Sequence, residues 1–141
     1  MNAAEISRSG LDVEWQRLQV IAENLANVNT SRTAGGAPYR AMRLLSGPTS
    51  SFDATVDGKH AMQPEKVQVL GMEPEGNGVR RVYDPQNPEA GADGFVTYPQ
   101  IDHAGEMMLM IQTSRAYEAD LAALNIAHQM YARALDLGKQ S

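Results

Sequence analysis

The stretch DHAGEMMLMIQTSRAYEADLAALNIAHQMYARALDL, residues 102–137, decides the fold, because its pattern repeats every seven residues and contains no proline. A repeat of seven is typical of a helix that packs along another helix. Asp102 is suited to cap the start of this helix, and Gly138 is suited to end it. At 1.5 Å per residue the helix would be roughly 54 Å long, which favours an assembly helix. The predicted seam has two rows, Met107, Ser114, Leu121, His128 and Leu135, and Met110, Tyr117, Leu124 and Tyr131.

Residues 3–28 carry a shorter version of the same repeat. The segment Asn27–Thr30 is expected to end this helix, because asparagine and threonine side chains bond nearby backbone groups. The sequence therefore predicts a mainly α fold in which the N- and C-terminal heptad helices pack as an antiparallel coiled coil. The predicted rows of the first helix are Ala4, Leu11, Leu18 and Leu25, and Ser7, Glu14, Ile21 and Val28.

Residues 31–100 differ in composition, since they hold all seven prolines and nine of the twelve glycines, which predicts a loop-rich central segment. Within it, the alternating stretches Lys66–Met72 and Val79–Tyr83 predict a small β-hairpin with a long turn. Residues 84–94 are expected to form a turn-rich connector, and Thr49–Lys59 a mobile polar stretch. The expected organisation is an N-terminal assembly helix (1–30), a central loop and β segment (31–100) and a C-terminal assembly helix (101–141), with the two helices forming one discontinuous domain.

The composition limits the classes of function. The chain has 141 residues, a net charge of −5, no cysteine and only 6% aromatic residues, so a single compact core would be thin. We therefore expect part of the apolar surface to be buried against partner subunits. The acidic balance gives no attraction to nucleic acid, and no apolar run approaches the roughly 20 residues of a membrane helix. The first residues carry Glu5 and Asp12 and no apolar core, so no signal peptide is expected.

A search for chemistry finds no convincing site. The three histidines, His60, His103 and His128, lack the spacing of metal ligands, and no Gly-x-Ser-x-Gly signature supports nucleophilic catalysis. The glycine pairs Gly76–Gly78 and Gly91–Gly94 lack the lysine of a phosphate-binding loop and are better read as turns. We therefore predict that the chain is not an enzyme and has no catalytic, cofactor-binding or metal site.

Two polar clusters have two interpretations each. Asn24, Asn27 and Asn29 could simply cap the first helix, or they could bond to a neighbouring chain, since three asparagines exceed what one helix end needs. Arg115 and Tyr117 could belong to an exposed polar face of the second helix. They could equally fix the register between packed helices, because arginine offers a planar fork of several donors.

The residues resemble those of the axial proteins of the bacterial flagellum, and the resemblance covers nearly the whole chain. The short length favours the short proximal rod proteins of that family over the longer distal rod and hook proteins. Asp120 departs from the family pattern, in which asparagine is usual at this position. The motifs that carry the resemblance are NLANVNT at 24–30, GAPYR at 36–40, VYDPQNP at 82–88, ADGFVTYP at 92–99, MIQTSRAYEA at 110–119, LN at 124–125 and ALDLG at 134–138.

The resemblance implies a structural subunit of the proximal rod, in the periplasmic part of the basal body, that assembles helically through its terminal helices. It implies type III export without a cleaved signal peptide, and as partners the other rod subunits and the rod–ring junction protein at the base of the ring complex. Another type of short proximal rod protein and a soluble coiled-coil adaptor remain alternatives. The expected assembly interface consists of Leu11, Leu18, Ile21, Asn24, Leu25, Asn27, Asn29, Arg115, Tyr117, Leu121, Leu124, Asn125 and Leu135.

Overall fold

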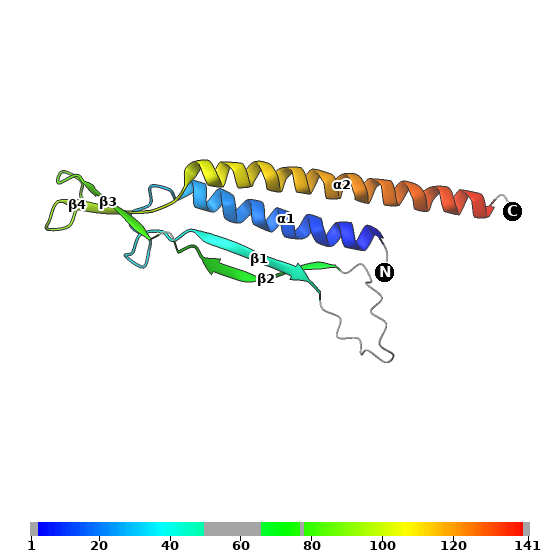
Figure 1. Cartoon of the computed structure of the whole chain (residues 1–141), viewed down its shortest axis with the longest axis horizontal. Coiled ribbons are helices and arrows are strands. Elements are labelled where there is room, and N and C mark those ends of the chain that lie inside the picture. The colour runs from blue at the N-terminus through cyan, green and yellow to red at the C-terminus, as the bar shows by residue number, and fades with distance from the viewer. Residues whose placement is uncertain (1–2, 50–65, 77, 140–141) are drawn as a thin grey trace, which may run out of the picture.

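The structure is a computed structural model that describes residues 3–49, 66–76 and 78–139. About half of these residues are helical, so the mainly α prediction is confirmed, and Figure 1 shows two long helices beside two short strand pairs. The stretch predicted to be mobile lies, apart from Thr49, outside the described residues. The elements are α1 (Ala3–Ala26), β1 (Met42–Pro48), β2 (Val67–Pro74), β3 (Val79–Tyr83), β4 (Phe95–Pro99) and α2 (His103–Lys139).

The two helices lie side by side and run in opposite directions (Figure 1). Near the end of α1, Asn24 contacts Glu106 in the first turn of α2. Fourteen residues earlier in α1, Gly10 lies against Asp120, fourteen residues later in α2. This register brings the start of α1 level with Ala127, so the last twelve described residues of α2, 128–139, extend past α1. We call this segment the overhang.

The predicted bounds of both helices are close to those observed. The Asp102 cap is confirmed, since its Oδ1 accepts a hydrogen bond from the Gly105 N–H at 3.1 Å. The prediction that Gly138 ends the second helix is wrong, because α2 continues through it to Lys139.

The predicted seam of α2 is wrong by one residue in its first row. The buried positions are Glu106, Thr113 and Ala127, whereas Met107 and Leu121 are exposed. The physical reason is the close approach of the helices: a Cβ atom added at Gly10 would lie 2.4 Å from Asp120 Oδ2. Small and polar side chains fit such a narrow contact, and bulky apolar ones are displaced from it. The first-row residues concerned are Met107, Ser114, Leu121, His128 and Leu135.

The strands β1 and β2 form an antiparallel pair that covers the face of α1 turned away from α2 (Figure 1). The register runs from Met42 opposite Pro74 to Pro48 opposite Val67, with an irregularity after Leu45. The main apolar core lies between this pair and α1. It consists of Val13, Val20 and Leu44, with Met42, Val67 and Val69 packed against them.

The predicted hairpin between 66–72 and 79–83 is wrong, although both strands exist. β2 pairs with β1, and β3 pairs with β4 through the register Val79 opposite Pro99 to Tyr83 opposite Phe95. The pairing with β1 gives β2 a covered face on α1, which pairing with β3 would not provide. The turn-rich connector at 84–94 is confirmed, and Gly94 within it has a φ of +76°.

The β3–β4 pair, which we call the distal sheet, lies beyond the ends of the helices and contacts neither of them (Figure 1). Two backbone hydrogen bonds tie the segments that lead to it, from Glu75 N to Ala41 O at 2.8 Å and from Gln100 N to Gly78 O at 3.2 Å. A small cavity of about 250 Å³ lies among these same segments. Arg80 of β3 adds a side-chain bond to Asn29 in the loop after α1.

Candidate functional site

The side chain of Asn24 links α1, α2 and β1. It is completely buried, at 0% exposed, and its Nδ2 donates to Met42 O at 2.9 Å and to Glu106 Oε2 at 3.2 Å. Its Oδ1 accepts from Met42 N at 3.0 Å and from the Tyr39 hydroxyl at 2.9 Å. These four bonds use the full donor and acceptor capacity of an asparagine side chain. We call Asn24, Tyr39, Met42, Arg43 and Glu106 the polar junction.

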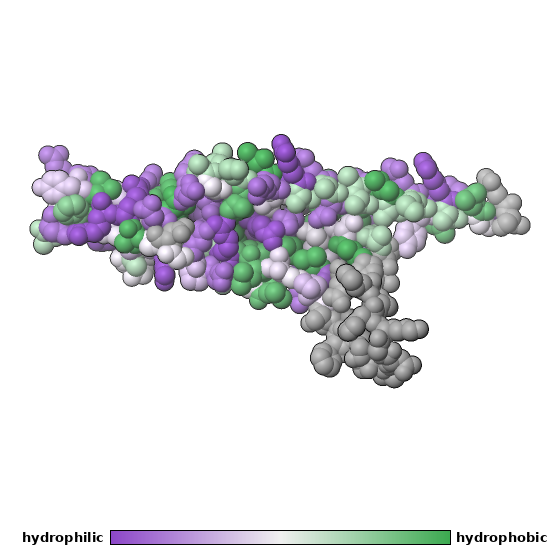
Figure 2. All heavy atoms as spheres, in the orientation of Figure 1, coloured by the Kyte–Doolittle hydropathy of each residue, from purple (hydrophilic) through white to green (hydrophobic). Residues whose placement is uncertain are grey.

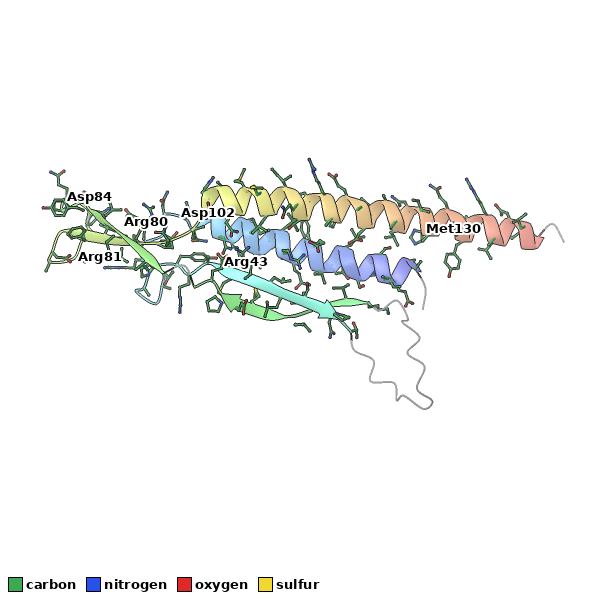
Figure 3. The ribbon with its side chains drawn as sticks, in the orientation of Figure 1. Arg43, Arg80, Arg81, Asp84, Asp102 and Met130 are labelled. Carbon is green, nitrogen blue, oxygen red and sulfur yellow. The ribbon has the colours of Figure 1, made fainter. Side chains whose placement is uncertain are left out.

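The polar junction contains a buried carboxylate that the sequence did not single out. Glu106 is only 3% exposed, and Arg43 places a guanidinium nitrogen 3.4 Å from its Oε1 while also pairing with Glu75. A buried carboxylate of this kind requires such compensation. Burial, together with the charges of Glu23 and Glu106, raises the pKa of Tyr39, so its hydroxyl remains a donor to Asn24. Figure 3 labels Arg43 and Asp102 at this end of the helix pair.

The other two asparagines also have partners within the chain. Asn27 donates to Glu23 O at 2.8 Å and accepts from the Thr30 hydroxyl at 2.9 Å, which closes the end of α1. Asn29 accepts from Arg80 at 2.9 Å. The capping interpretation therefore describes Asn27, and Asn24 has no hydrogen-bonding capacity left for a neighbouring chain.

A groove of about 660 Å³ runs between the first half of α1 and the second half of α2. Leu11, Tyr117 and Leu124, three residues of the predicted interface, line it together with Trp15. The rings of Trp15 and Tyr117 lie 6.4 Å apart, and Trp15 is 54% exposed.

The carboxylate of Asp120 packs directly against Gly10 of α1. It has no hydrogen-bond or ion-pair partner among the described residues. Burial against α1 raises the pKa of this carboxyl group. A carboxylate at this position is therefore less favourable than a neutral side chain of the same size.

The overhang exposes apolar side chains. Figure 2 shows green and pale green residues along this end, and Figure 3 places Met130 on α2 beyond the start of α1. On a helix, the polar residues Gln129, Arg133 and Asp136 lie on the side opposite the apolar stripe. The exposed apolar residues of the overhang are Met130, Tyr131, Leu135 and Leu137, of which Leu137 is 71% exposed, and Ile126 lies just before it.

The remaining residues of the predicted interface are found in different surroundings. Ile21 is buried, at 3% exposed, and Leu18 and Leu25 are half-buried. Leu121, Arg115 and Asn125 are exposed, and neither polar side chain has a partner in the described part of the chain. Sequence reasoning did not identify the core residues Val13 and Val20 or the polar-junction residues Tyr39, Arg43 and Glu106. The seven-residue spacing of the two valines was the one sequence signal that could have indicated their burial.

Within residues 3–49, 66–76 and 78–139, no three His, Asp or Glu side chains gather as metal ligands would. None of the helices described there combines the length and apolar character needed to cross a membrane.

Comparison with known proteins identifies the family. A family model described as "Flagellar basal body rod FlgEFG protein C-terminal" matches residues 92–137. "Flagellar basal-body rod protein FlgC" of Escherichia coli O6:H1 is 33% identical over 139 residues, which cover 99% of this chain and 98% of the relative. The chain belongs to the FlgC family.

FlgC proteins of distant bacteria show similar agreement. That of Bacillus subtilis is 31% identical over 98% of this chain and 97% of its own length. That of Agrobacterium fabrum is 34% identical, over 99% and 95%. Members of the FlgC family are structural proteins of the flagellar basal-body rod, so the resemblance to flagellar axial proteins and the prediction that the chain is not an enzyme are confirmed.

Proposed function

We propose that this chain is a structural subunit of the proximal rod that self-assembles helically through its terminal helices. The observation that carries this proposal is the overhang, a twelve-residue amphipathic helix end whose apolar side lies uncovered in the single chain. Fully burying one leucine side chain contributes about 1.5–3 kcal/mol. Several such side chains therefore favour association with another helix strongly.

The helix pair supplies the rest of the assembling surface. We infer that its two helices pack as an antiparallel coiled coil, and that the groove beside Trp15, lined by Leu11, Tyr117 and Leu124, faces neighbouring subunits. Arg115 and Asn125 are exposed and set the register between subunits. Ile21 and Asn24 are buried and act within the subunit instead.

The cellular setting follows the FlgC family. The chain is part of the shaft that crosses the periplasm, and it leaves the cytoplasm by type III export without a cleaved signal peptide. Its neighbours are the other rod subunits and the rod–ring junction protein at the base of the ring complex. The names and lengths of the relatives support this setting.

The test is to replace Leu135 by Asp in the host bacterium, with Gln129→Asp on the polar side of the same helix end as the matched control. We expect Leu135→Asp cells to make the protein but to lose swimming and to lack rods in electron micrographs of basal bodies. Gln129→Asp cells should swim normally. If Leu135→Asp cells swim as well as the control, the overhang is not an assembling surface. A soluble adaptor would instead stop at a small closed oligomer in sedimentation at rising concentration.

A further inference from the structure

We propose that the overhang of one copy of this chain lies in the groove between α1 and α2 of the next copy, with the two copies side by side and staggered. This inference rests on the proposed self-assembly and names the two surfaces that meet.

The two surfaces have the same length. The α1 side of the groove extends from Ala4 to Trp15, which is twelve residues, and the overhang also has twelve residues. At 1.5 Å per residue each is about 17 Å long. If neighbouring copies are displaced along the helix axis by one overhang length, the overhang of one copy therefore spans the whole groove of the next.

The apolar surfaces also match. Before the overhang, the face of α2 that packs against α1 includes Thr113, Asp120 and Ala127. The same stripe continues along the overhang as Tyr131 and Ala134, because residues three and four apart share a helix face. Since α1 has ended at this level, the stripe has no cover within the described chain. The groove offers the complementary apolar wall, with Leu11, Trp15 and Leu124.

The net charges of the two surfaces are opposite in sign. The groove is lined by two carboxylates, Glu5 and Asp12, and one guanidinium, Arg8. The overhang carries two cations, Arg133 and Lys139, and one carboxylate. Glu5 already pairs with Lys66 at 3.0 Å, but Asp12 has no partner in the described part of the chain. Arg133 and Lys139 lie away from the stripe of Tyr131 and Ala134 that enters the groove, so the apolar match and not an ion pair carries the inference.

The contact cannot form within one chain, because Ala134 lies past the start of α1 and far from Leu11 along the helix axis. It is also heterologous, since the groove and the overhang are different surfaces. A heterologous contact leaves a free groove at one end and a free overhang at the other, so copies continue to add. Pairing of two overhangs with each other would instead close at a dimer.

The absence of cysteine from the chain allows a direct test by cross-linking. A tagged Leu11→Cys chain is mixed with untagged Ala134→Cys, at concentrations where sedimentation shows assembly, and treated with a short bismaleimide. Ala132→Cys is the matched control, since Ala132 is also an exposed alanine but lies on the opposite side of the overhang. We expect the mixed dimer to form at least tenfold more with Ala134→Cys than with Ala132→Cys.

A second readout uses Trp15, the single tryptophan, which lines the groove. Its emission should shift to shorter wavelength on assembly. Equal cross-linking at 134 and 132, a product joining two Ala134→Cys chains, or assembly without an emission shift would each overturn the inference and leave self-assembly standing. If the chain does not sediment as growing assemblies at any concentration, the proposed self-assembly itself is wrong.

Discussion

Replacing Asn24 by alanine removes the central side chain of the polar junction, and we expect it to be among the most destabilising single changes in the chain. The substitution breaks four hydrogen bonds, two donated by Nδ2 and two accepted by Oδ1. It leaves the N–H and C=O of Met42 facing a space that is closed to solvent, because Asn24 is 0% exposed. The loss therefore includes the cost of burying unpaired polar groups.

The magnitude follows from these bonds. A hydrogen bond contributes about 0.5–1.5 kcal/mol net, and a buried group left unpaired costs about 1–3 kcal/mol. For four bonds, with the Met42 groups left in a closed site, we expect a loss of about 4 kcal/mol in the free energy of unfolding. Asn29→Ala is the matched control, because it removes one exposed bond to Arg80 and should cost about 0.5 kcal/mol.

The assay is urea unfolding followed by circular dichroism, at protein concentrations below those at which the chain associates. A double-mutant cycle with Glu106→Gln would measure how strongly Asn24 and Glu106 depend on each other. If Asn24→Ala and Asn29→Ala destabilise the chain equally, the buried hydrogen bonds of Asn24 do not hold the helices and β1 together.

Two further predictions concern the helix pair. Burial raises the folded-state pKa of Asp120 above its unfolded value, so ionising this carboxyl costs stability at neutral pH. Asp120→Asn should therefore raise the urea midpoint at pH 7 and lose this advantage as the pH falls through the two pKa values; an equal gain at pH 7 and in acid would contradict the burial of this carboxylate. In hydrogen exchange on the dilute chain, the backbone amides of 20–26 and 104–113 should exchange much more slowly than those of 128–139, because the overhang has no second helix beside it. Equal protection in the two regions would contradict the assigned register of the helices.

The sequence predicted the helices well because their signals are local. A seven-residue repeat and an aspartate cap depend on residues within one or two turns, and both ends of the helix pair were placed within a few residues. The seam of α2 was less predictable, because its buried positions are Glu106, Thr113 and Ala127 rather than large apolar residues. Two tertiary features explain these positions: the narrow contact of the helices at Gly10, and the bonds that Glu106 makes with Asn24 and Arg43.

The strand pairing and the polar junction depend on residues far apart in the sequence. β2 pairs with β1 because both pack on α1, and the short stretch around Leu44 carries no clear strand signal in the sequence alone. Asn24 looked like one of three capping asparagines, and its link to Glu106 spans 82 positions. Glu106 itself looked like an ordinary acidic residue near a helix start.

The way the distal sheet is attached has a mechanical consequence. One segment of the chain joins the distal sheet to β2 and another joins it to α2. Hydrogen bonds at Glu75 and Gln100, together with the Arg80–Asn29 bond, tie these segments to the rest of the subunit. A twisting force on the distal sheet is therefore distributed over several connected segments of backbone and does not act on a single flexible linker. In the rod subunit proposed above, these bonds resist twisting of the distal sheet relative to the helices.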